Sequence, residues 1–276
     1  MSDGLPPRVV RLPLRPALVL GVAVLLGLAM FCWPLFAHPQ PGGAVHTTDA
    51  PFVFMATLPV LILVVLAELS DGGIDAKALA LLGVLSAVNA GLRPLGAGTG
   101  GIELVFFLLV LAGRVFGPGF GFVLGSTSLF TSALLTAGVG PWLPFQMLAS
   151  SLIGLGAGLL PRRPRGKAEI ALLVAYGVFA AYLFGLLMSL WSWPFLAGAS
   201  LGGDTAGLGF VPGAPLVDNL HRFAVFTVLT STLGWDTGRA VTNAVAIVLL
   251  GPAVLAVLRR AARRAAFDAP VTFDQP

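Results

Sequence analysis

Charged residues are scarce in this chain: Asp, Glu, Lys and Arg make up 10% of its 276 residues, whereas hydrophobic residues make up 57%. A soluble domain has about 25% charged residues, and one folded core cannot bury so much apolar surface. The composition therefore excludes an ordinary water-soluble domain and predicts a protein whose outer surface lies in lipid. The 35 Gly and 21 Pro fit this interpretation, because glycine allows membrane helices to approach closely and proline is tolerated where neighbouring helices satisfy the freed backbone groups.

Cysteine and the common catalytic motifs are also scarce or missing. Cys32 is the single cysteine, so no intrachain disulfide can form. The sequence has no Walker A loop, HExxH, GxSxG or CxxC motif, which excludes the ATPase, zinc-protease and serine-hydrolase chemistry that depends on them. It also lacks the chain of intramembrane carboxylates that a proton pump needs and the repeated broken helices of many secondary transporters. His38, His46 and Asp49 share one loop, but without helical or hairpin spacing they do not predict a metal site.

Eight apolar runs are candidates for membrane spans, each of which needs about 20 apolar residues. They cover residues 16–37, 51–67, 76–92, 102–116, 120–138, 141–160, 168–195 and 237–258. We therefore expect an all-α, polytopic transmembrane helix bundle. Residues 218–233 are expected to form a helix that lies on or dips into the outer surface, contiguous with the last span. The first run is interpreted as an uncleaved anchor and not a signal peptide, because it is long and no clean A-x-A cleavage site follows it.

The basic residues predict the orientation of the bundle. With eight spans, 13 of the 16 Lys and Arg fall on the side of the two termini, and only Arg93, Arg222 and Arg239 fall on the other. Because Lys and Arg accumulate on the cytoplasmic side of membrane proteins, both termini are expected in the cytoplasm of a plasma-membrane protein. The net charge of +4 then follows from topology and indicates no nucleic-acid partner.

Polar side chains gather near the predicted outer ends of several spans. Such residues are informative, because an ionisable group costs about 2.5–3.5 kcal/mol at mid-bilayer depth. Several of them are four residues apart and so share a helix face, as Trp142 and Gln146 do. We predict that the set lines an outward-facing, solvent-open substrate pocket. Its members are Asn89, Arg93, Glu103, Trp142, Gln146, Trp235, Asp236, Arg239 and Asn243.

Simpler explanations compete for some of these features. Trp191 and Trp193, at the end of the seventh span, are better explained as interfacial anchors. Arg239 could pair with Asp236 across one turn or extend to the membrane surface. The inner ends of the spans show only ordinary basic flanks. Small residues at four-residue spacing in the third, fifth and sixth spans indicate close helix crossings, more often within a chain than between proteins.

The stretch from Lys77 to Arg264 resembles the S components of energy-coupling-factor (ECF) transporters, which are their substrate-binding membrane subunits. The similarity rests on the small-residue third span running into NAGLRPLG, the AGRVFGP turn, the GPWLPFQ entry to the sixth span, and LGWDTGRAVTNAVAIVLLGP near the C-terminus. The resemblance implies a six-helix S-component domain over residues 76–276. Residues 1–75 would then be an N-terminal segment with two additional transmembrane helices.

The resemblance also implies a function for a binder that has no energy source of its own. S components capture a vitamin and dock a transmembrane coupling protein with two ATPases, so ATP would be used by the partner subunits, and this chain would be neither an enzyme nor a cofactor carrier. The sequence is most similar to cobalamin-type members. The family's AxxxA docking pattern on the first core helix is matched by Ala76 and Ala80, and by Gly83 and Ala87 with one Gly in place of Ala.

Two other classes of protein stay open on the sequence. One is a stand-alone transporter or channel for small molecules. The other is a membrane enzyme acting on lipid-linked substrates, with Glu103 or Asp236 as its acid or base.

Overall fold

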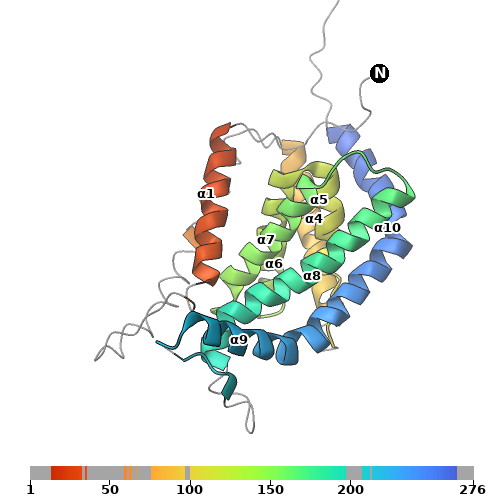
Figure 1. Ribbon diagram of the computed structural model, residues 1–276. Coiled ribbons are helices and arrows are strands. Elements are labelled where there is room, and N and C mark those ends of the chain that lie inside the picture. Colours follow the sequence, from red (N-terminus) through yellow and green to blue (C-terminus); the bar gives the residue numbers. More distant parts are fainter. Residues whose placement is uncertain are drawn as a thin grey trace, which may run out of the picture.

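The computed structural model describes residues 14–32, 35, 59–60, 62–63, 67, 76–96, 100–196, 207–211 and 213–265. This part of the chain forms a bundle of helices without strands (Figure 1). The helices are α1 (Leu14–Phe31), α4 (Ala76–Leu92), α5 (Val105–Phe116), α6 (Pro118–Leu135), α7 (Leu143–Leu159), α8 (Lys167–Leu196), α9 (Leu216–Thr227) and α10 (Thr237–Ala265), with a 3-10 turn η1 (Arg93–Gly96) and a π-helical segment η3 (Val228–Asp236). Among these residues, 5 helices are long and apolar enough to cross a membrane, so the predicted all-α polytopic bundle is confirmed.

Most predicted spans coincide closely with the helices, but α10 runs to Ala265 and so extends past the predicted end of the last span at residue 258. The third span has the bounds of α4, and α6, α7 and α8 begin and end within a few residues of the predicted limits. α5 begins three residues later than expected, which leaves Glu103 in the turn before the helix. The predicted helix over 218–233 is present as α9 and η3, and it continues into α10 without a break. The second predicted span, 51–67, lies largely outside the described residues, and the division at residue 75 stays a prediction.

The two ends of the bundle differ in charge. At the Glu103 end, α4 and α8 finish while α5, α7 and α10 begin, and α9 lies across this end (Figure 1). At the opposite Arg114 end, α5, α7 and α10 finish and α8 begins. In the described part of the chain, every Lys and Arg lies toward the Arg114 end except Arg93, Arg222 and Arg239. The predicted separation of basic residues is therefore present, and its assignment to the cytoplasm stays a prediction.

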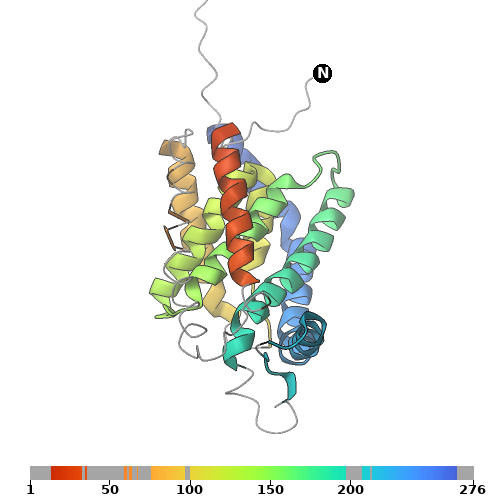
Figure 2. The same cartoon turned by 60° about the vertical axis from the view of Figure 1, so that its left-hand side comes forward.

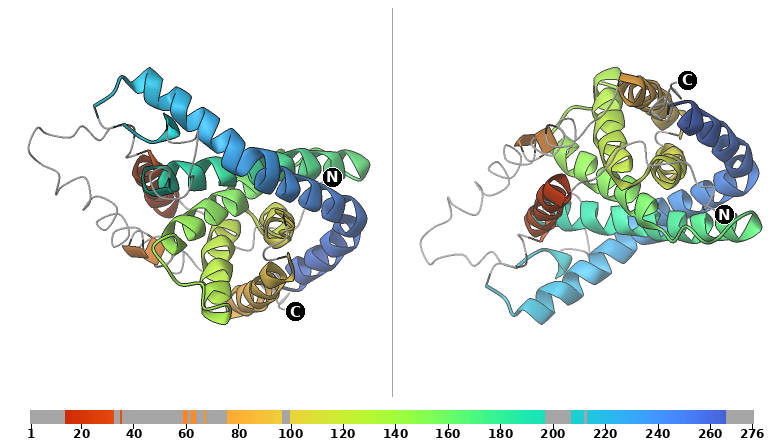
Figure 3. Two further views of the ribbon diagram at one scale, coloured as in Figure 1. Left: turned by 90° about the horizontal axis from the view of Figure 1, so that it is seen from below. Right: turned by 90° about the horizontal axis from the view of Figure 1, so that it is seen from above.

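α5 forms the centre of the bundle. All its residues are buried, and Figure 3 shows it enclosed by α4, α6, α7, α8 and α10. On one side, α5, α6 and α7 meet backbone to backbone at Gly113, Gly121 and Gly154, where a Cβ on any of them would collide with a neighbouring main chain. The small-residue pattern of the fifth and sixth spans thus serves internal packing, as expected for helices that approach this closely.

α1 lies outside this six-helix arrangement and leans on one flank of it (Figure 2). It contacts α7 and α8: the rings of Phe31 and Phe145 pack edge to face at 5.2 Å, and Gly27 lies against Leu148. Leu14, Leu18 and other large side chains on the remaining surface of α1 are exposed. Among the described residues, one narrow stripe of α1 therefore joins the bundle, and the rest of its surface is left uncovered.

The prediction that Trp193 is an interfacial anchor was wrong. Its side chain is fully buried, and the indole Nε1 donates a hydrogen bond to the Leu208 carbonyl oxygen at 2.9 Å. Phe210 and Phe223 pack against its ring, each with a centroid distance of 5.4 Å. Trp193 therefore attaches α9 and the segment before it to the end of α8, and in doing so it holds the helix that crosses the Glu103 end.

Candidate functional site

Close backbone contacts place Glu103 beside the start of α10. Gly101 has a φ of +83°, a conformation that residues with a Cβ rarely adopt, and a Cβ there would collide with the Trp235 carbonyl. Gly238 in turn lies against the carbonyl oxygen of Gly100. The turn before α5 therefore sits directly on the first turn of α10. Glu103 also precedes the N-terminus of α5, where the helix dipole stabilises a carboxylate.

Glu103, Asp236, Arg239 and Asn243 form one connected group, here called the Glu103 cluster. Arg239 lies between the two acids: its Nε donates to Glu103 Oε2 at 2.5 Å and its Nη1 to Asp236 Oδ1 at 2.8 Å. Asn243 Nδ2 donates to the main-chain oxygens of Arg239, at 2.7 Å, and of Glu103, at 3.2 Å. The sequence placed these four residues at the same depth on two helices, and the structure brings them into contact.

Two local features bring Asp236 and Arg239 into the bundle. Asp236, at the end of the π-helical segment η3, is only 1% exposed, while its neighbour Trp235 is 43% exposed and points to another side. Gly185 on α8 leaves room for the Asp236 carboxyl group, which a Cβ at that position would overlap. The Arg239 guanidinium also lies over the ring of Phe184, 5.2 Å from its centroid.

Arg93 and Gln146 form a second polar contact at the same end. Arg93 Nη2 donates to Gln146 Oε1 at 2.9 Å, joining η1 to the first turns of α7. Arg93 is close enough to Glu103 and Arg239 for both charges to act on its guanidinium. One turn before Arg93, Asn89 Nδ2 donates to Ser128 Oγ at 3.0 Å. The predicted set is therefore distributed over α4, η1, the turn before α5, the start of α7, η3 and α10.

Several atoms of these side chains are buried and have no hydrogen-bond partner among the described residues. They are Asn89 Oδ1, Arg93 Nη1, Asp236 Oδ2 and Asn243 Oδ1. A buried polar atom without a partner costs about 1–3 kcal/mol. The group therefore has one cationic donor, two amide acceptors and one carboxylate acceptor without partners.

Within the described part of the chain, no side-chain contact joins Trp142 or Trp235 to this group. Their side chains are 41% and 43% exposed, and the Trp142 indole donates locally to the Gly138 carbonyl oxygen at 3.3 Å. Trp142 precedes the first residue of α7 and Trp235 lies near the end of η3, and both are at the surface of the bundle. A direct role for them in binding stays a prediction.

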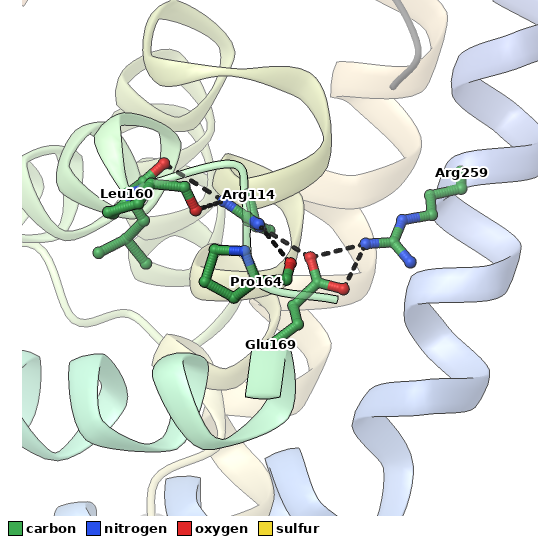
Figure 4. Close-up of polar contacts among 6 residues, drawn as sticks. Arg114, Leu160, Pro164, Glu169 and Arg259 are labelled. Atoms are coloured by element: carbon green, nitrogen blue, oxygen red, sulfur yellow. Dashed lines mark hydrogen bonds and ion pairs between the residues drawn. The ribbon is translucent and has the colours of Figure 1, made fainter. Parts of the chain in front are cut away.

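A buried ionic group lies at the other end, where the sequence predicted only basic flanks. Figure 4 shows Glu169 between two arginines, with Arg114 Nε at 2.8 Å and Arg259 Nη2 at 2.7 Å from its carboxylate. Arg114 also donates to the carbonyl oxygens of Leu160, Pro161 and Pro164. The Arg114 and Glu169 side chains are each 4% exposed. This triad ties α5, the α7–α8 turn, α8 and α10 together, and no spacing along one helix signals it.

The small residues of α4 differ from those of α6 and α7. Ala76, Ala80, Gly83 and Ala87 are all exposed along one face of the helix. A Cβ at Gly83 or Gly91 would meet nothing within 4 Å. Internal packing, the commoner explanation of such a stripe, therefore does not account for it among the described residues.

The sequence model of the family described as ECF transporter, substrate-specific component, matches residues 77–258. The match begins at the first turn of α4 and ends in the last turns of α10, so it covers the helices that carry the Glu103 cluster, Arg93 and Gln146. No curated protein and no solved structure matches the chain.

Proposed function

The chain belongs to the family of ECF transporter substrate-specific components, and from that premise we propose that it captures a vitamin or related micronutrient from outside the cell. The Glu103 cluster, together with Asn89, Arg93 and Gln146, is the proposed binding site. Separate coupling and ATPase subunits then drive uptake. The chain has no ATP-binding motif of its own, so ATP acts only through those partners.

The observation that carries the proposal is the set of unsatisfied polar atoms at the Glu103 end. Arg93 Nη1 is a charged donor, whereas Asn89 Oδ1, Asn243 Oδ1 and Asp236 Oδ2 are acceptors, and all four are buried. A ligand that offers both acceptors and donors would recover the free energy that these atoms lose by burial.

The substrate that we favour is cobalamin or a compound of similar chemistry. Cobalamin carries primary amides, which donate and accept hydrogen bonds, and a phosphodiester, which accepts them. Amides fit Asn89 and Asn243, and an anionic oxygen fits Arg93. The neighbouring Glu103 carboxylate, at 21% side-chain exposure, can accept a further donor. A molecule with both kinds of group is therefore a better match than a purely hydrophobic one.

The exposed face of α4 is the proposed docking surface for the coupling protein. This face carries the small residues Ala76, Ala80, Gly83 and Ala87, so the backbone of a partner helix can approach it closely. The contrast with Gly121 and Gly154, whose positions are filled by neighbouring main chain, supports this assignment. Docking at α4 would leave α1 on a different flank, where it packs on α7 and α8.

Binding and transport have different requirements under this proposal, so each can be measured separately. The purified chain should bind its substrate alone, whereas cells should accumulate the substrate only when the coupling protein and ATPases are also present. Binding is measured by titration calorimetry with a vitamin panel that includes cobalamin, and uptake with radiolabelled substrate. Concentrative uptake by the isolated chain in liposomes would overturn the proposal and favour a stand-alone transporter.

A further inference from the structure

A cavity of about 380 Å³ opens between α4 and α10 at the Arg114 end, far along both helices from the Glu103 cluster. Figure 3 shows α4 and the C-terminal part of α10 side by side in both views. The residues that line the cavity are Lys77, Leu81, Val257, Arg260, Ala261 and Arg264.

The charged residues of this cavity are all cations. Arg260 and Arg264 are four residues apart on one face of α10, and Lys77 lies in the first turn of α4. Within the described residues, none of the three takes part in an ion pair, although Arg259, beside Arg260, pairs with Glu169. Like charges at this spacing repel one another. An anion between the helices would turn that repulsion into attraction.

The remaining lining is apolar, and two of its residues lie on the membrane side of the cations. Leu81 is one turn beyond Lys77 toward the middle of α4, and Val257 is one turn before Arg260 toward the middle of α10. Val257 is exposed, as are Leu79 and Val84 on α4. Both helices are long and apolar enough to span a membrane. The cations therefore lie where headgroups would be, with a hydrophobic groove leading toward the lipid tails.

We infer that this cavity binds an anionic phospholipid. Lys77, Arg260 and Arg264 hold the headgroup phosphate, and an acyl chain lies along Leu81 and Val257. Inorganic phosphate would satisfy the cations equally well, but it would leave the apolar part of the groove without a partner. A basic pocket between transmembrane helices is a recognised arrangement for acidic headgroups.

The test is native mass spectrometry of the full-length protein titrated with phosphatidylglycerol, phosphatidylcholine or inorganic phosphate. The variant K77Q/R260Q/R264Q should lose about tenfold or more in affinity for phosphatidylglycerol, since each juxtamembrane cation contributes about fivefold. The matched control is R163Q/R165Q/R263Q, which removes three exposed cations from the same end of the bundle but from outside the cavity lining. This control should stay within about twofold of the wild type, because its cations lie outside the cavity lining and solvent screens their charge.

A second variant separates a lipid from a free phosphate. V257W fills the apolar part of the groove and keeps every cation, so it should weaken phosphatidylglycerol binding several-fold and leave phosphate binding unchanged. Equal losses in the two triple variants would overturn the inference in favour of diffuse attraction. Displacement of the lipid by millimolar phosphate would overturn it in favour of a free-anion site. Unchanged lipid binding in K77Q/R260Q/R264Q, with loss of coupling-protein assembly, would make the groove a protein-docking surface.

Discussion

Replacing Glu169 by Gln tests the role of the buried triad most sharply. The substitution keeps the shape of the side chain and removes its charge, which leaves Arg114 at 4% exposure without a counterion. Breaking a buried ion pair in this way costs about 3–5 kcal/mol, because an uncompensated charge stays buried. We place E169Q at about 3 kcal/mol, since Arg114 keeps its bonds to the Leu160, Pro161 and Pro164 carbonyls.

The neighbouring arginines provide the comparison. Arg259 is 32% exposed, so water can solvate Glu169 when it is removed, and R259Q should cost about 1 kcal/mol or less. Arg163 is exposed at the same end, and R163Q should cost about 0.5 kcal/mol at most. A double-mutant cycle between positions 114 and 169 should give a coupling of about 2–3 kcal/mol.

The measurement is equilibrium unfolding of the purified protein in mixed micelles by titration with sodium dodecyl sulfate, followed by far-ultraviolet circular dichroism. The predicted order of stability is R163Q above R259Q above E169Q. If E169Q were no less stable than R163Q, the triad would not hold the helices together, and the reasoning from burial would be refuted.

Three further predictions concern packing, docking and topology. G185A places a methyl group on the Asp236 carboxyl and should cost about 2 kcal/mol in the same titration, whereas G177A, whose methyl meets the movable tip of Ile247, should cost less than half as much; equal losses would contradict the close fit. A80L and G83L should lower uptake about tenfold or more and leave substrate affinity unchanged, while G21L, at an equally open position on α1, should retain both; loss of binding in the α4 variants would instead indicate internal packing. In a C32A background, V217C should react with a membrane-impermeant maleimide in intact cells and R263C should be protected; the reverse pattern would invert the predicted orientation.

The helices of this protein were largely predictable because lipid imposes a simple rule on the sequence. A span must be long and apolar, so the bounds of α4 follow directly from where its apolar residues begin and end. The start of α5 did not follow. The glycine turn at Gly100 and Gly101 packs on α10, and that contact, which depends on residues far along the chain, keeps Glu103 out of the helix.

The sequence predicted the depth of each candidate site residue along its helix, but it predicted only some of the partners of these residues. Depth along each helix placed Arg93, Glu103 and Arg239 at one end, because topology fixes which end each residue occupies. Which side chains pair across helices depends on rotation and tilt, which one sequence does not reveal. The Glu169 triad was not predicted for the same reason, because in sequence Arg114 resembles any basic residue that flanks a span. The prediction for Trp193 was wrong because, in sequence, a tryptophan near a span end that faces lipid is the same as one that packs under α9.

The central claim is that a vitamin-like substrate binds at the Glu103 end through Arg93 and Asn243. The direct test is calorimetric titration of the purified protein with cobalamin and a vitamin panel, with melting temperatures recorded for every variant. R93Q and N243A should each weaken binding about tenfold or more, since each leaves a buried polar partner unpaired. R222Q, which removes an arginine at the same end that bonds to the Gly207 carbonyl, should bind as the wild type does. Wild-type affinity in folded R93Q and N243A would contradict the account.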